Sequence, residues 1–357
     1  MRQDWDKIVA VTGGAGFIGS NLLLYLVSKY TDYLFVNIDC LTYAANLSNL
    51  TEIEDAENYR FEKMSIADFE KLSACFDKYN FDAVIHLAAE SHVDRSIFGP
   101  SDFVATNLNG TFNLLELIRN RQESGKSMRL VHISTDEVYG SLGDDDPVFS
   151  EGSPYRPNSP YSATKAGGDH LVGAYIKTYG IDAVITHSSN NFGPHQFPEK
   201  LIPLVINNIL NRQEIPVYGD GQNIRSWLYV EDHCRALDMI LHEGKKGATY
   251  LIDAGNEIRN LDLVRALCRK VDEKVGISGS EKLIVFVEDR AGHDYRYAMD
   301  VSRIHEELGW QPQNNFEEAL DRTINWYLEH QDWLNACISG KYMKYYEMNY
   351  KRKLSQK

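Results

Sequence analysis

The stretch GGAGFIG at 13–19 constrains the fold more than any other part of the sequence. Gly13, Gly16 and Gly19 lie between an apolar run at 7–14 and a helical pattern at 20–30. Glycines at this spacing permit a tight strand-to-helix turn and let backbone amides approach a pyrophosphate at the positive end of the helix. Alone the motif is weak, because glycine turns also serve simple strand-to-helix connections.

The next apolar run strengthens the case for a dinucleotide site. It covers 33–39 and ends in Asp39, 20 residues beyond Gly19, where an acid can bind a ribose hydroxyl of adenosine. The following residue, Cys40, is not an arginine that would accept the extra phosphate of NADP. The pattern therefore predicts a dinucleotide site that takes NAD.

Short apolar runs alternate with longer helical patterns through the first half of the chain. Further strands are expected at 81–89, 129–135 and 181–189, and helices at 102–121 and 159–180. This alternation predicts an α/β fold, a Rossmann-type doubly wound parallel sheet. After residue 189 the chain becomes rich in Gly, Pro, Asn and aromatic residues, as in binding loops. We expect an NAD-binding domain at 1–188 and 227–254, and a smaller mixed α/β substrate-binding lobe at 189–226 and 255–357.

Charge and cysteine content narrow the class of protein. The net charge of −14 argues against binding to a nucleic-acid backbone, and no apolar run approaches the roughly 20 residues that span a bilayer. The N-terminus enters a strand pattern with no room for a signal peptide. The five cysteines are scattered, with no CxxC pair and no zinc-ligand spacing. We expect a cytoplasmic protein without a metal site or a membrane partner.

Tyr161 and Lys165 are four residues apart in an expected helix, so they share one face. An ammonium group near a phenol lowers the pKa of the phenol and makes it a usable base. An ordinary surface Tyr-Lys pair would look the same, but the upstream dinucleotide turn weakens that alternative.

Thr135, Asp136 and Glu137 follow the apolar run RLVHIS. Ligands of open parallel sheets bind outside the carboxyl ends of the strands, so these side chains should reach the same pocket as Tyr161. Taken alone, the acid pair could equally cap the following turn.

Eight segments together are similar to one known family. They are TGGAGFIGSN, DCLTYAANL, HLAAESHVDRSI, STDEVYG, SPYSATKAGGDHLV, SSNNFGPHQFPEKLIPL, YGDGQNIRSWLYVEDH and DRAGHDYRYAMD. In this order they closely resemble the nucleotide-sugar 4,6-dehydratases of the extended short-chain dehydrogenase/reductase family. The resemblance runs from about residue 7 to about residue 333.

The resemblance implies three steps in one pocket, with NAD as cofactor and dTDP-glucose as substrate. Tyr161, helped by Lys165 and Thr135, would take the proton of the carbon-4 hydroxyl during oxidation. Glu137 would then remove the proton on carbon 5, and Asp136 would protonate the departing carbon-6 hydroxyl. The hydride would return to carbon 6, giving a 4-keto-6-deoxy sugar. Two close carboxyls readily share one proton, which suits such an elimination.

The resemblance also implies binding residues. Cofactor contacts would come from Gly13, Gly16, Phe17, Ile18, Gly19, Asp39, Thr42, Ile66, Leu87, Ala88, Ala89, Thr106, Tyr161, Lys165 and Asn191. Substrate contacts would come from Ser91, Thr135, Asn190, Lys200, Leu201, Tyr218, Arg225, Asn260, Arg290 and His293.

Three departures from the family pattern stand out. Ser65 replaces the usual aspartate beside Ile66, so either Asp68 compensates or that adenine contact is absent. Ser226 stands where an aspartate is common, and Ala45 where a glycine is common.

Several alternatives remain open. A sister dehydratase would act on UDP-glucose or another nucleotide hexose, and a carbon-4 epimerase would need neither acid. A catalytically silent NAD-binding scaffold would be expected to lack Tyr161, Lys165 or the acids. The family implies a homodimer through helices at 101–121 and 160–179. The tyrosine-rich, basic segment 341–357 is expected to be an edge helix with a frayed end.

Overall fold

The computed structural model describes residues 5–338. The segment 341–357, for which an edge helix is expected, lies outside the described residues. Within residues 5–338, no helix has both the length and the apolar character needed to cross a membrane.

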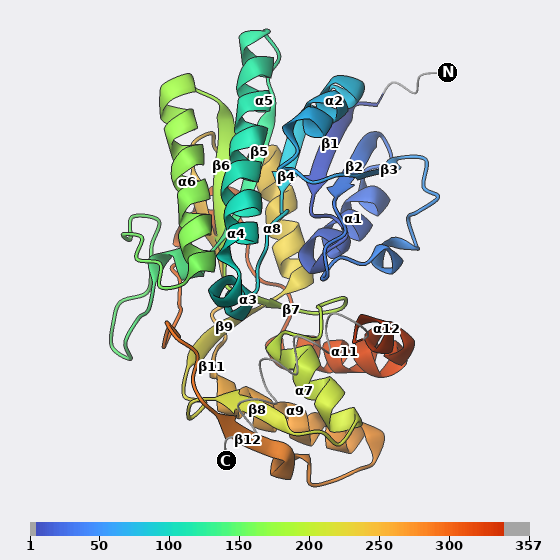
Figure 1. Ribbon diagram of the computed structural model, residues 1–357, viewed down its shortest axis with the longest axis vertical. Coiled ribbons are helices and arrows are strands. Elements are labelled where there is room, and N and C mark those ends of the chain that lie inside the picture. Colours follow the sequence, from blue (N-terminus) through green and yellow to red (C-terminus); the bar gives the residue numbers. More distant parts are fainter. Residues whose placement is uncertain (1–4, 339–357) are drawn as a thin grey trace.

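A seven-stranded sheet forms the centre of the larger part of the molecule (Figure 1). Its spatial order is β3-β2-β1-β4-β5-β6-β10, and all its pairings are parallel. The order reverses direction between β1 and β4, which is where such sheets bind ligands. This confirms the predicted doubly wound parallel sheet. The strands are β1 (Lys7–Thr12), β2 (Tyr33–Asp39), β3 (Tyr59–Lys63), β4 (Ala83–His86), β5 (Arg129–Thr135), β6 (Asp182–Ser188) and β10 (Thr249–Ile252).

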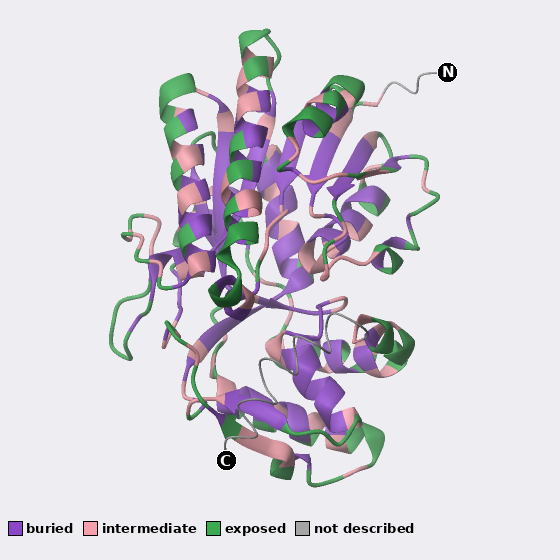
Figure 2. Ribbon diagram, viewed as in Figure 1, coloured by how far each residue is buried: buried purple, intermediate pink, exposed green. Residues whose placement is uncertain are grey.

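Helices cover both faces of this sheet because successive strand residues point to opposite sides. Val9 and Val11 of β1 pack in one apolar cluster with α1 (Phe17–Lys29) and α8 (Val230–Glu243). Ala10 belongs to the cluster on the opposite face, with α2 (Phe69–Tyr79), α5 (Thr111–Glu123) and α6 (Pro160–Tyr179). Figure 2 shows the strands buried between the two helical layers.

The smaller lobe has its own core below the carboxyl end of the sheet (Figure 1). Two small sheets belong to it, β11-β9-β7 and β12-β8. Their strands are β7 (Asn190–Phe192), β8 (Ile215–Tyr218), β9 (Ile224–Tyr229), β11 (Glu257–Arg259) and β12 (Ile284–Val287). The accompanying helices are α7 (Leu201–Leu210), α9 (Asn260–Val275), α11 (Phe316–Glu329) and α12 (Gln331–Cys337), while α10 (Ser302–Leu308) packs on the cluster of α1 and α8.

The segment 102–121 is helical, as predicted, but it is not one regular α-helix. After α3 (Val93–Phe98), the short α4 (Pro100–Phe103) leads into a π-helical segment, η2 (Val104–Gly110), before α5 begins. The Asn107 side chain exchanges hydrogen bonds with the backbone of Glu90 (2.9 and 3.0 Å) and donates to Thr164 (3.0 Å). These tertiary bonds hold the wider turn, which a local sequence pattern does not reveal. Such segments are often found at functional sites.

Candidate active site

The glycine turn between β1 and α1 leaves room for a phosphate group. Gly13 has a φ of 74°, and a Cβ there would lie 2.7 Å from the backbone of Ala88. A Cβ on Gly19 would overlap the carbonyl oxygen of Gly13. Gly16 caps α1 without a side chain, so no side chain occupies the amides of the first turn. The turn therefore fits the pyrophosphate of a dinucleotide.

A cavity of about 300 Å³ opens beside this turn. All fifteen residues expected to contact the cofactor line it. Asp39 holds a fixed orientation at the end of β2, because its two oxygens accept the backbone N–H groups of Ala15 (3.0 Å) and Leu41 (2.8 Å). Burial raises the pKa of Asp39, and these two hydrogen bonds oppose that effect. The lining fits NAD.

The Ser65 departure has no substitute in Asp68. Ser65 and Ile66 line the cavity, and Asp68 does not. Asp68 instead caps α2, accepting the backbone N–H of Lys71 (3.2 Å) and pairing with its ammonium (2.9 Å). Of the two possibilities, the structure favours absence of the adenine contact that the family's aspartate would make.

Tyr161 and Lys165 lie in the first turns of α6. Ser159 and Ser162 form a capping box and Pro160 occupies the first helical position, which fixes where the helix begins. Tyr161 is 8% exposed and Lys165 is 4% exposed, and both face the cavity. The Lys165 ammonium donates to the carbonyl of Ile133 in β5 (2.7 Å).

The expected lowering of the phenol pKa is not found in the protein alone. Burial raises the pKa of Tyr161 and the charge of Glu137 adds to that, while a hydrogen bond with Thr135 opposes it. Burial also lowers the pKa of Lys165. The sequence spacing correctly places both groups on one face, but it does not include the cost of burying charge.

The acid pair lies in η3 (Asp136–Tyr139), directly after β5. Thr135 caps this turn, accepting the backbone N–H of Glu137 (3.3 Å) and donating to one oxygen of Asp136 (3.2 Å). The other Asp136 oxygen is buried without a hydrogen-bond partner in the described part of the chain. The turn capping considered above is thus done by Thr135, and both acids face the cavity.

The two acids differ in their surroundings. Burial raises the pKa of Asp136 well above its ordinary value, and the charges of Glu137 and Asp253 raise it further. Burial also raises the pKa of Glu137, but the cations of Arg290, Lys200 and Arg225 oppose that effect. The surroundings therefore favour protonation of Asp136 over protonation of Glu137.

A second cavity of about 170 Å³ adjoins the first. Glu137, Asn190 and Lys200 line both cavities. Ser91 and Thr135 line the first cavity only. The remaining expected substrate contacts line the second: Leu201, Tyr218, Arg225, Asn260, Arg290 and His293. The fold thus brings the whole predicted set together around two adjoining cavities.

The cations of the second cavity differ in what they can bind. Arg225 already donates to the carbonyls of Ile224 (2.8 Å), Tyr295 (3.2 Å) and Asp294 (2.8 Å). The Arg290 Nε is buried without a hydrogen-bond partner in the described chain, so it is available to an anion. The pKa of His293 is lowered to about 4 by burial and by Arg290, which leaves its ring neutral near pH 7.

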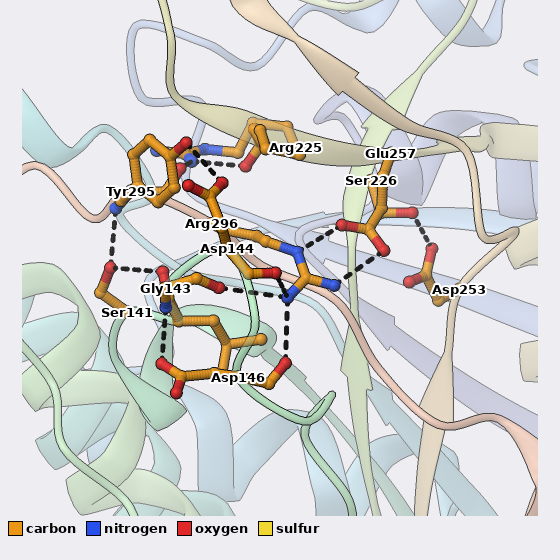
Figure 3. Close-up of polar contacts among 12 residues, drawn as sticks. Ser141, Gly143, Asp144, Asp146, Arg225, Ser226, Asp253, Glu257, Tyr295 and Arg296 are labelled. Carbon is orange, nitrogen blue, oxygen red and sulfur yellow. Dashed lines mark hydrogen bonds and ion pairs between the residues drawn. The ribbon is translucent and has the colours of Figure 1, made fainter.

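Arg296 connects the loop that follows the acid pair to the smaller lobe (Figure 3). Its guanidinium binds both oxygens of Glu257 in β11 (2.6 and 3.1 Å) and donates to the carbonyls of Gly143 (3.2 Å) and Asp146 (3.1 Å). The neighbouring Tyr295 donates through its hydroxyl to Asp144 (2.7 Å). The loop at 143–146 is therefore fixed to β11 of the smaller lobe.

Three acids near the site were missed by sequence reasoning; Glu199 and Asp253 are buried and Glu90 is half-buried. Glu90 and Glu199 line the first cavity, and Asp253 accepts hydrogen bonds from Ser189 (2.9 Å) and Ser226 close to Asp136 (Figure 3). Glu90 and Glu199 stand inside the motifs HLAAES and FPEK, so their position was a usable signal. No local signal distinguishes Asp253.

Comparison with known proteins indicates a nucleotide-sugar 4,6-dehydratase. A family model described as GDP-mannose 4,6 dehydratase matches residues 10–323. The dTDP-glucose 4,6-dehydratase of Neisseria meningitidis serogroup B is 49% identical over 344 residues, covering 94% of this chain and 97% of the relative.

Two similar solved structures are also dTDP-glucose 4,6-dehydratases. The dTDP-glucose 4,6-dehydratase of Streptomyces venezuelae, solved with NAD bound, is 42% identical with a TM-score of 0.86, covering 92% of this chain and 99% of that one. The Bacillus anthracis dTDP-glucose 4,6-dehydratase, in complex with NAD, is 40% identical with a TM-score of 0.83, covering 93% and 99%. With the glycine turn, the Tyr-Lys pair and the two acids around one space, these similarities show that the chain belongs to the nucleotide-sugar 4,6-dehydratase family.

Proposed function

We propose that this protein is an NAD-dependent lyase that converts dTDP-glucose to dTDP-4-keto-6-deoxyglucose and water. Five relatives named dTDP-glucose 4,6-dehydratase are 48–49% identical to this protein and match nearly the whole chain. The cavity beside the glycine turn fits NAD, and the adjoining cavity offers Arg290 to a diphosphate.

The residues divide the work as follows. Bound NAD would supply the acceptor for the carbon-4 hydride and the source of the hydride that returns to carbon 6. Tyr161 accepts the carbon-4 hydroxyl proton, with Thr135 bonding the same oxygen and the Lys165 ammonium favouring the phenolate. Glu137 removes the proton on carbon 5, which the 4-keto group has made acidic. Asp136 gives its proton to the carbon-6 hydroxyl, which leaves as water.

The observation that carries this proposal is the unequal pair Asp136 and Glu137. To eliminate water from the bound sugar, the protein needs one protonated carboxyl as the acid and one ionised carboxyl as the base. Asp136 has a buried oxygen without a partner and a strongly raised pKa, while three cations oppose the same effect at Glu137. A carbon-4 epimerase removes no water and has no use for such a pair.

The remaining proposals concern organisation. We assign NAD binding to 1–188 and 227–254, and nucleotide-sugar binding to 189–226 and 255–357. We also propose a cytoplasmic homodimer that pairs segments 101–121 and 160–179 with their copies. Exposed apolar side chains on these segments and the adjoining α3 support the dimer: Phe98, Val104, Phe112 and Tyr179.

The first prediction is that Glu137→Gln still oxidises carbon 4 but stalls before water loss. The amide keeps the size of the side chain and cannot accept the carbon-5 proton, so turnover falls by about 10²–10⁴-fold. Stopped-flow absorbance should show NADH accumulating, whereas the native enzyme shows no net NADH. Native-rate dehydration by this variant would remove Glu137 from the role of base.

Tyr161→Phe is the matched control, because it should lose the oxidation step and accumulate no NADH. Side-by-side turnover of dTDP-glucose and UDP-glucose then tests the base preference. Persistent stoichiometric NADH in the native enzyme would contradict the whole mechanism.

A further inference from the structure

Asp169 is a fully buried carboxylate that the mechanism above does not use. It lies on α6, one turn after Lys165 and two turns after Tyr161. Its oxygens accept hydrogen bonds from His132 (3.0 Å) and Ser134 (2.8 Å) of β5 and from His187 (3.1 Å) of β6. Ser134 directly precedes Thr135 and the acid pair. One side chain thus joins the catalytic helix to the end of the catalytic strand.

Two buried histidines contact the Asp169 carboxylate. Burial lowers the pKa of His132, and its Nδ1 has no partner within the described chain, as suits a neutral ring with the proton on Nε2. His187 contacts the Tyr139 hydroxyl through Nδ1 (3.0 Å) and Asp169 through Nε2. The same Nε2 also contacts the Tyr155 hydroxyl (3.0 Å). Asp169 thus lies in a buried network of histidine, serine and tyrosine side chains.

The carboxylate remains ionised in spite of its burial. Burial alone would raise the pKa of Asp169, but hydrogen bonds from His132 and His187 outweigh it and lower the pKa. The nearby buried cation is Lys165, whose ammonium donates to a neutral carbonyl, that of Ile133. Burial disfavours the charged form of this lysine, and the charge of Asp169 acts in the opposite direction.

We propose that Asp169 is a positioning residue that serves as the buried counter-ion of the Lys165 ammonium and fixes α6 against the end of β5. The proposal rests on the function proposed above, because only Tyr161 chemistry requires a charged lysine at this place. Gly168 supports the close packing, since a Cβ there would lie 3.2 Å from the carbonyl of Asn107 and 3.6 Å from His132.

Removing the charge should move the pH dependence in one direction. Without Asp169, the Lys165 ammonium loses a stabilising charge and the Tyr161 phenolate loses a repelling one. Both groups would release their protons at lower pH. The rising and the falling limb of the plot of kcat against pH would therefore both move to lower pH. The other titratable groups facing this region are His86, His132, Asp136, Glu137, Tyr139, Tyr155 and His187.

The second prediction is made for Asp169→Asn, which keeps the size and removes the charge. We expect kcat with dTDP-glucose to fall roughly tenfold at the native pH optimum, with KM within about twofold, since the variant loses assistance rather than the base itself. The pH profile of kcat should move to lower pH. In the cofactor-free protein, competitive acetylation with acetic anhydride, read by mass spectrometry, should give Lys165 a labelling midpoint at lower pH.

The labelling arm separates this proposal from the proposed function, because it needs no substrate and no turnover. Asp238→Asn is the matched control. Asp238 lies on α8, is equally buried and is away from both cavities. It accepts hydrogen bonds from Lys29 (2.6 Å) and Tyr30 (2.9 Å) at the end of α1. This control should lower the melting temperature and leave the Lys165 midpoint unchanged.

Two results would overturn the proposal. One is an unchanged Lys165 midpoint in a folded Asp169→Asn protein, and the other is the same shift in Asp238→Asn. If Asp169→Asn does not fold, Asp169→Ser removes the charge within the same space and is labelled instead. Asp169→Glu, which restores the charge, should return the midpoint toward the native value.

Discussion

Glu90 shows how burial changes a single carboxyl group at the rim of the cofactor cavity. It follows β4, is half-buried and lines the cavity. Burial raises its pKa to about 7, and the neighbouring charge of Asp102 adds to this while Arg95 opposes it. Because the folded protein holds this proton above the ordinary pKa of 4.5, stability is lost as the pH rises from about 4.5 through 7.

The third prediction is that Glu90→Gln is more stable than the native protein at pH 8, by about 2 kcal/mol, and equal to it at pH 4. The amide cannot ionise, so it avoids the cost of a buried charge. Thermal unfolding at the two pH values measures the difference. The exposed Glu52→Gln serves as control and should change neither value. An equal effect of Glu90→Gln at both pH values would contradict the stated pKa.

For single residues, the sequence predicted which residues form the site better than it predicted their pKa values and hydrogen-bond partners. The glycines, Tyr161 and the acid pair could be located from spacing and from motifs. The raised pKa of Tyr161 and the network of Asp169 depend on neighbours from β5, β6 and η3, which lie far apart in the sequence. Local patterns contain no information on these neighbours.

Among the elements, the turn from β1 into α1 tolerates the least change. The fourth prediction is that Gly19→Ala weakens NAD binding by more than about tenfold, because its Cβ would overlap Gly13 and displace the amides that face the pyrophosphate. Isothermal titration calorimetry measures the change.

Gly173→Ala in α6 is the matched control. A Cβ there meets no atom within 4 Å, so this variant should bind NAD normally and gain up to about 1 kcal/mol of stability. Native NAD affinity in Gly19→Ala would show that the turn can relax, and would contradict the stated constraint.

Long, regular elements were predictable because their apolar spacing is intrinsic. The strand at 33–39 matches β2, and the strand at 129–135 matches β5. The π-helical η2 was not predictable, since hydrogen bonds from Asn107 to Glu90 and Thr164 maintain it. The short strands β7, β8, β11 and β12 were also missed, because three or four residues carry too little pattern.

For the whole molecule, the proposed dimer requires that the exposed face of α5 be covered by the partner subunit. Phe112 on α5 is 44% exposed, and Phe69 on α2 is 42% exposed. The fifth prediction is that Phe112→Glu yields monomers and Phe69→Glu does not, because only the former places a charge within the proposed interface. Analytical ultracentrifugation distinguishes the two. A native monomer, or dissociation by both substitutions, would contradict the proposed interface.

The shared wall between the two cavities has a further consequence for the intact molecule. Glu137, Asn190 and Lys200 border both spaces. A sugar tethered by its diphosphate in one space can present carbons 4, 5 and 6 in turn to stationary groups in the other. The whole sequence then proceeds within a single residence, and a reactive unsaturated ketone is consumed before it can diffuse away.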